Sequence, residues 1–190
     1  RLEGRFASFD VIWEPRDTIG GDLWWVSSSK HEGPFVLAVA DCTGHGVPGA
    51  MLSLLVSNSF ERIYATDTDH DPVAALKLLD NYVGTGLNQD RPDSESDDGC
   101  DAAILRIDPK RRQVEYAGAK LELWQLKVLG EVLRHPAARI SLGYSQRLTE
   151  DDRPDLQVIH YEKDDTFVIV TDGFTDQIGG PDDRRVSYGY

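Results

Sequence analysis

Three aspartates along the chain stand in settings that could support metal chemistry. Asp22 follows two glycines, while Asp41 and Asp172 each follow an apolar run that is typical of a buried strand. An ionised carboxylate in such a place is costly unless it is paired, hydrogen-bonded or bound to metal. If strand ends bring the three together, their oxygens suit a hard cation such as Mg²⁺ or Mn²⁺. Each could equally cap a turn, because Asp beside Gly is a common turn signal, so the residues alone leave both interpretations open.

The segment after Asp41 is rich in glycine and leads toward a predicted helix. Gly44, His45 and Gly46, with Gly49, could cradle a phosphate at a helix N-terminus. The segment lacks the nucleotide-binding P-loop pattern, and a tight turn is the alternative. His45 could act as an acid or base, although a lone His between glycines is more often a turn residue or a hydrogen-bond donor.

Two further residues with reactive or charged side chains lie near these aspartates in the sequence. Cys42 has no basic partner in a Cys-His-Asn pattern, which favours a small buried residue over a nucleophile. Arg16 lies six residues before Asp22. It could bind a phosphate in a bidentate manner or pair with one of the many acidic residues.

Short apolar or alternating runs bounded by Gly, Pro or Asp predict the strands that must position these residues. The Asp108-Pro109 turn signal predicts a hairpin between two of them. The expected strands cover residues 9–13, 35–40, 102–107, 114–117, 121–128, 156–161 and 166–171.

Helical spacing appears in two adjacent stretches. One begins at Pro48, and the other begins at Pro72 with Asp71 as its N-cap. The acidic segment 88–98 predicts a solvated loop. Because helices and strands are segregated along the chain, we expect an α+β fold with helices covering sheet faces.

Composition excludes several functional classes. The chain has 190 residues, which suits one domain, and 33 acidic against 20 basic residues give a net charge of −13. Such a charge disfavours non-specific binding to nucleic acid or to an anionic membrane surface. No stretch is apolar enough for a bilayer span, and two cysteines favour a reducing compartment. We therefore expect a cytoplasmic protein that does not bind nucleic acid.

Together and in order, the motifs resemble the metal-dependent Ser/Thr protein phosphatases of the 2C type (PPM), in particular their bacterial SpoIIE/RsbU-like branch. The resemblance covers nearly the whole chain, and its blocks around Asp41 and Asp172 are specific. The end of the last block is most similar to SiaA-type members, membrane receptors whose cytoplasmic end is this phosphatase. The segments that carry the resemblance are 14–16 (EPR), 19–22 (IGGD), 39–50 (VADCTGHGVPGA), 98–103 (DGCDAA), 116–119 (YAGA) and 171–180 (TDGFTDQIGG).

The resemblance implies a β-sandwich flanked by helices (α-β-β-α) and phosphate-ester hydrolysis with two Mg²⁺ or Mn²⁺ ions. It implies that Asp41 bridges both metals and that the backbone carbonyl of Cys42 binds the second. Asp172 would bind the first metal, and Asp22 would act on the same cluster. Asp41 and Asp172 are then the expected catalytic residues. Phosphate binding is expected, less specifically, from Arg16, Gly44 and His45.

The resemblance also implies partners and a place in the cell. The expected substrate is a phosphorylated STAS-domain protein of the anti-anti-sigma type, in a partner-switching pathway. The domain would be the cytoplasmic part of a membrane receptor, with homodimerisation and regulation through the two predicted helices as further expectations. Where eukaryotic members carry a His after the Asp-Gly pair, this chain has Thr43, so water would protonate the leaving group.

One departure from the family pattern leaves an alternative open. The family ends with another metal-binding Asp, and no acidic residue follows Asp183 here. We therefore expect a single domain over residues 1–190 that lacks the family's C-terminal helix and strand. A non-catalytic module that binds its partner without turnover is the alternative. A GGDEF-type cyclase is disfavoured, because Leu23 and Trp24 stand where that motif requires Glu-Phe.

Overall fold

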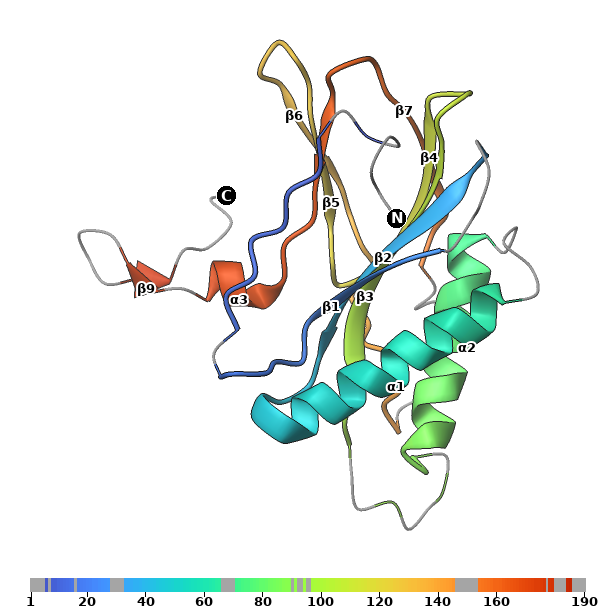
Figure 1. Cartoon of the computed structure of the whole chain (residues 1–190), viewed down its shortest axis with the longest axis vertical. Coiled ribbons are helices and arrows are strands. Elements are labelled where there is room, and N and C mark those ends of the chain that lie inside the picture. The colour runs from blue at the N-terminus through green and yellow to red at the C-terminus, as the bar shows by residue number, and fades with distance from the viewer. Residues whose placement is uncertain are drawn as a thin grey trace.

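Within the described residues, the computed structural model contains a larger, five-stranded antiparallel sheet, a smaller, three-stranded one and a two-stranded pair near the C-terminus, with two helices on the outer face of the larger sheet (Figure 1). It describes residues 6, 8–15, 17–27, 33–65, 71–89, 91, 94, 97–145, 154–176, 178–179 and 184–185. The larger sheet has the order β1-β2-β3-β4-β7 and the smaller one the order β6-β5-β8. In the larger sheet, the strands are β1 (Leu23–Val26), β2 (Phe35–Cys42), β3 (Cys100–Asp108), β4 (Gln113–Ala119) and β7 (Gln157–His160). In the smaller sheet, they are β5 (Leu123–Leu126), β6 (Val132–His135) and β8 (Thr166–Val168).

The two-residue alternation of strand side chains explains the layers. In β2, Val36 and Ala38 join the apolar cluster under the helices, while Phe35 and Leu37 pack in the cluster between the sheets. The neighbouring strand β3 follows the same rule, because Ile104 faces the helices and Leu105 faces the other sheet. A strand buried on both faces is apolar almost throughout, which is why β2 and β3 were predicted from the sequence.

Helices α1 (Gly46–Tyr64) and α2 (Pro72–Gly86) lie side by side against the larger sheet (Figure 1). Both were predicted, and α1 begins two residues before the expected Pro48. In α2 the Asp71 carboxylate accepts a hydrogen bond from the Ala74 amide at 2.9 Å, which confirms the predicted N-cap. The predicted α+β class is confirmed.

Most predicted strands are confirmed, although their limits shift. The β3–β4 pairing confirms the hairpin, with Ile104 opposite Ala117. The strand predicted over residues 9–13 is wrong: these residues form no strand, and the side chain of Ile12 is 92% exposed. Five elements were not predicted: β1, β6, the helical turn α3 (Asp172–Thr175), and the short strands β9 (Ile178–Gly179) and β10 (Arg184–Arg185).

The acidic segment 88–98 is only partly a solvated loop. Gln89 is buried, and its side-chain amide donates to the Asp98 carbonyl at 2.7 Å and also to the Gly143 carbonyl. The Asp98 amide donates back to the Gln89 side chain at 2.7 Å. The two ends of the segment are thus tied together. In the described part of the chain, no helix combines the length and the apolar character that crossing a bilayer requires.

Candidate functional site

The structure brings Asp22, Asp41 and Asp172 into one electrostatic neighbourhood. Asp41 is the last residue but one of β2, and Asp22 directly precedes β1. Because Leu23 lies opposite Ala40, the antiparallel register places Asp22 beside Asp41. Asp172 is the first residue of α3, in the segment that follows β8. The expected convergence of the three aspartates is therefore present.

Burial and mutual repulsion dominate the electrostatics of this group. The pKa of the Asp41 carboxyl is raised to about 8, first by burial and then by the charges of Asp22 and Asp172. The pKa of Asp22 is also raised, first by burial, while its hydrogen bond with Asp41 acts in the opposite direction. A cation among these oxygens would relieve the repulsion and stabilise their ionised forms.

The chemistry of the donors therefore fits hard divalent cations such as Mg²⁺ or Mn²⁺. All three side chains offer only carboxylate oxygens, and Asp41 and Asp22 are half-buried. Among the described residues, however, no three His, Cys, Asp or Glu side chains already stand in a ligand arrangement.

A fourth carboxylate, Asp101, belongs to the same neighbourhood and was not among the predicted site residues. It lies directly opposite Asp41 in the β2–β3 register. Burial raises its pKa, and the charge of Asp172 adds to the rise. The Ser141 hydroxyl donates to the Asp101 carboxylate at 2.5 Å, and the Lys120 ammonium lies 3.7 Å from the same oxygen. In the sequence, Asp101 precedes an apolar run, whereas Asp41 and Asp172 follow one, so Asp101 lacked the signal that identified those two residues.

The structure supports the interpretation of Cys42 as a buried residue. Burial, followed by the charges of Asp41 and Asp22, raises the pKa of its thiol to about 12, which disfavours the thiolate. The Cys42 carbonyl lies against Gly21, where a Cβ would come within 2.6 Å of the carbonyl oxygen and 3.0 Å of the Gly44 oxygen. Gly21 is therefore needed to let its backbone lie close to the backbone of Cys42 and Gly44.

The glycine-rich segment forms the turn that leads into α1. Gly44 has a left-handed φ of +86°, and Gly49 packs so closely that a Cβ would lie 2.6 Å from the Gly44 oxygen. His45 holds the N-cap position of α1 but makes no side-chain cap. Its Nδ1 lies 2.8 Å from the Asp17 carboxylate, and both side chains are exposed. This geometry is that of the predicted tight turn; phosphate binding by Gly44 and His45 stays a prediction. Arg16 lies outside the described residues.

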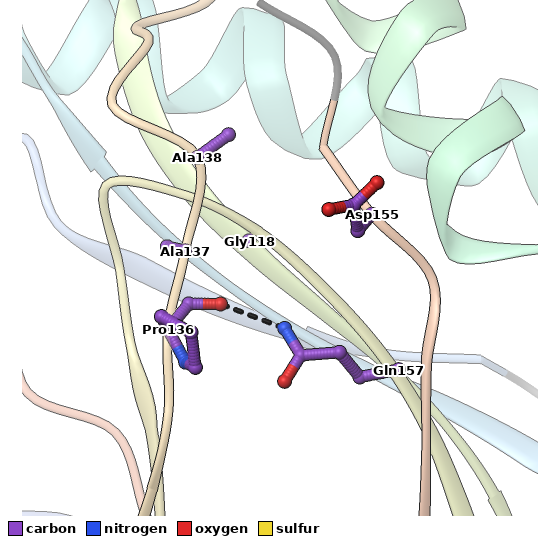
Figure 2. A pocket seen from close by; sticks show the side chains of 6 residues that line it. All are labelled: Gly118, Pro136, Ala137, Ala138, Asp155 and Gln157. Carbon is purple, nitrogen blue, oxygen red and sulfur yellow. Dashed lines mark hydrogen bonds between the residues drawn. The ribbon is translucent and has the colours of Figure 1, made fainter.

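A pocket of about 200 Å³ is lined by none of the predicted site residues (Figure 2). Figure 2 shows the side-chain amide of Gln157 reaching the Pro136 carbonyl, and this hydrogen bond is 2.7 Å long. The pocket is lined by Gly118, Pro136, Ala137, Ala138, Asp155 and Gln157. It is therefore not the place where the four carboxylates gather.

Residues 31–188 match the family model described as "Stage II sporulation protein E (SpoIIE)". The curated protein "Phosphoserine phosphatase RsbP" of Bacillus subtilis (strain 168) is 25% identical over 173 residues, which cover 90% of this chain and 40% of that protein. The chain thus spans about two fifths of the length of this curated relative.

Two solved structures illustrate the fold. The SiaA-PP2C domain of Pseudomonas aeruginosa is 29% identical, with a TM-score of 0.76 over 93% of this chain and 65% of that one. RsbX, solved in complex with magnesium, is 21% identical, with a TM-score of 0.58 over 88% of this chain and 71% of that one. The chain therefore has the fold of PP2C-type phosphatases.

Proposed function

The chain belongs to the SpoIIE family, and we propose on this basis that it is a divalent-metal-dependent phosphatase domain that hydrolyses a phosphoserine or phosphothreonine protein. The predicted resemblance to the SpoIIE/RsbU-like branch is confirmed by the family match. The observation that carries the proposal is the gathering of Asp22, Asp41 and Asp172 at one end of β1 and β2, within the PP2C-type fold.

We assign the metal-binding roles as follows. Asp41 would contact both ions, as the family resemblance implies, and its position beside Asp22 in the β1–β2 register supports this role. Asp172 would hold one ion, and the Cys42 carbonyl the other. Asp22 would bind directly or through water. Two Mg²⁺ or Mn²⁺ ions, when bound, would activate water and neutralise phosphate oxygens.

The protein itself would bind and orient the phosphate. The turn at Gly44 and His45 precedes the first turn of α1, whose unpaired amides attract anions. Arg16 would add a bidentate contact from its position six residues before Asp22.

The proposed substrate is a phosphorylated regulator of the STAS-domain type. This proposal is supported by the family match and by the likeness to proteins named RsbP and SiaA. We propose a cytoplasmic location, joined to a membrane receptor and able to form a homodimer, on the resemblance to SiaA-type members alone. In that setting, α1 and α2 would transmit a signal to the carboxylates, because α1 begins four residues after Cys42.

The test is hydrolysis of an aryl phosphate and of a phosphoserine protein, with and without Mn²⁺, by the chain and its Asp41→Ala variant. We expect Mn²⁺-dependent activity that the substitution abolishes. The matched control is Asp10→Ala, which removes an exposed carboxylate outside the site. Full activity of the Asp41→Ala variant would contradict the metal assignment.

A second candidate function is a module that binds its partner without turnover. Such a module would keep the SpoIIE-family fold without hydrolysing a phosphoester. Calorimetric titration with Mn²⁺ separates the two functions. Binding that disappears in the Asp41→Ala variant supports the phosphatase, whereas no binding by the unchanged chain supports the module.

A further inference from the structure

Lys120 has an unusual backbone conformation beside Asp101, one of the four carboxylates. It directly follows β4 with a left-handed φ of +58°, which is uncommon for a residue with a side chain. Its amide donates to the Ala138 carbonyl at 2.8 Å, and its backbone bridges to Ala102 of β3. Strained conformations of this kind persist only where the surroundings impose them, and they concentrate at functional sites.

The conformation places the Lys120 side chain next to Asp101. Its Nζ lies 3.7 Å from Asp101 Oδ1, and the side chain is 50% exposed. Ser141 donates to the same oxygen at 2.5 Å, which fixes the carboxylate that anchors the ammonium. An ammonium has three donors, and this ion pair is too long to be a strong hydrogen bond. The ammonium is therefore positioned at the site and still accessible to a ligand.

Stability alone is a weak explanation for this arrangement. A half-exposed ion pair contributes little, typically about 0–1 kcal/mol. Gly or Asn would adopt the left-handed conformation with less strain than Lys. A role of the Lys120 ammonium in binding therefore explains this residue better than its contribution to the stability of the fold.

The negative charge of the neighbouring aspartates indicates what the Lys120 ammonium would bind. Asp101 lies opposite Asp41 and interacts electrostatically with Asp172. A phosphoryl group that approaches this acidic end of the sheet is repelled unless cations meet it. A lysine held at the edge supplies such a charge as a point donor to phosphate oxygens.

We propose that Lys120 binds phosphoryl oxygens of the substrate and that Asp101 and Ser141 are the residues that position its ammonium. This inference rests on the proposed phosphatase function. It adds a contact on the β3–β4 side of the carboxylates, separate from the turn at Gly44 and His45.

The experiment measures the binding of inorganic phosphate to the Mg²⁺-loaded chain by calorimetry, without turnover, for Lys120→Asn, Lys120→Gly and Lys120→Arg. Asn and Gly tolerate the left-handed backbone but lack the charge, so we expect each to weaken phosphate binding about tenfold, as loss of one charge-assisted hydrogen bond implies. Arg keeps the charge and should bind phosphate within about threefold of the unchanged chain. The affinity for Mg²⁺ should not change.

Kinetics with the phosphoserine protein give a second readout. The two uncharged variants should raise KM more than they lower kcat, and their thermal unfolding should match or exceed that of the unchanged chain. Unchanged phosphate affinity in Lys120→Asn and Lys120→Gly would overturn the inference while leaving the phosphatase function intact. Equal weakening in Lys120→Arg would also overturn it. An unchanged chain that neither binds phosphate with Mg²⁺ nor hydrolyses phosphoesters would overturn both proposals.

Discussion

Asp41 and Asp101 lie directly opposite each other across the β2–β3 pair, yet their surroundings differ in sign. The Asp101 carboxylate is contacted by the Ser141 hydroxyl and the Lys120 ammonium. The Asp41 carboxyl is surrounded by the carboxylates of its neighbours and has its pKa raised to about 8. Ser141 and Lys120 partly offset the rise in the Asp101 pKa that burial causes, whereas every neighbour that acts on Asp41 raises its pKa further, which a bound cation would reverse.

This contrast predicts different consequences for two matched substitutions. Asp41→Asn should reduce Mn²⁺-dependent phosphatase activity to background, because it removes the proposed shared metal ligand. Asp101→Asn should lower kcat/KM about 10- to 100-fold, as loss of an outer partner usually does. Aryl phosphate kinetics with a Mn²⁺ titration measures both, with circular dichroism as the control for folding. An Asp101→Asn variant as inactive as Asp41→Asn would place Asp101 among the ligands instead.

The two glycines before Asp22 predict unequal tolerance to alanine. At Gly21 a Cβ would lie 2.6 Å from the Cys42 oxygen, whereas at Gly20 the nearest contact is the Pro15 Cβ at 3.3 Å. Gly21→Ala should therefore displace backbone at the site and lower the free energy of unfolding by about 1–3 kcal/mol. Gly20→Ala is the matched control and should cost less. Urea unfolding of both variants checks this, and equal losses would contradict it.

Much of the site's frame could be predicted from the sequence, because β2 and β3 are buried on both faces and therefore read as continuous apolar runs. The prediction over residues 9–13 failed because an exposed extended segment can show the same apolar pattern as a strand, while only a partner strand decides between them.

Other features could not be predicted because they depend on contacts between distant parts of the chain. The ion pair joins Lys120 to Asp101 of β3, and the buried side chain of Gln89 is bonded to the Asp98 carbonyl. Neither contact is visible in the local sequence pattern. Asp101 itself was visible in the sequence, but its importance follows from the β2–β3 register that places it opposite Asp41.

Thr43 connects β2 to the end of the acidic segment. Its hydroxyl donates to the Gly99 carbonyl at 3.0 Å, accepts from the Gly99 amide at 3.1 Å, and lies 2.6 Å from the Tyr144 hydroxyl. Thr43→Val should lower the free energy of unfolding by about 1–2 kcal/mol, because these polar partners lose their contact. Thr43→Ser keeps the hydroxyl and is the matched control. A Thr43→Val variant as stable as Thr43→Ser in urea unfolding would contradict the prediction.

A carboxylate far from the site predicts the acid sensitivity of the smaller sheet. The Asp165 side chain is 1% exposed, and its Oδ2 accepts from Lys127 at 2.7 Å, from the Gln125 amide at 2.8 Å and from the Glu162 backbone amide at 2.9 Å. Burial by itself would raise the pKa of Asp165, but these hydrogen bonds, with Lys127 the largest contribution, bring the pKa below its usual value of 3.8.

Because the pKa is lower in the folded state, the unfolded chain binds the proton first as the pH falls. The contribution of Asp165 to stability is therefore fully present above the usual pKa of 3.8 and is lost as the pH falls through the lowered folded value. Asp165→Asn should lower the thermal midpoint at pH 7 by roughly 5 °C. The difference in thermal midpoint between Asp165→Asn and the unchanged chain should shrink as the pH falls below 3.8.

The control for that measurement is Asp164→Asn, which removes the same charge from the neighbouring exposed residue. Asp164 has a left-handed φ of +71°, a conformation that Asn tolerates well, so no backbone strain is added. Thermal unfolding followed by circular dichroism from pH 7 to pH 3 should separate the two variants at neutral pH and bring them together in acid. A deficit of Asp165→Asn that stays constant with pH would mean that lost packing, and not the ionised carboxylate, is responsible.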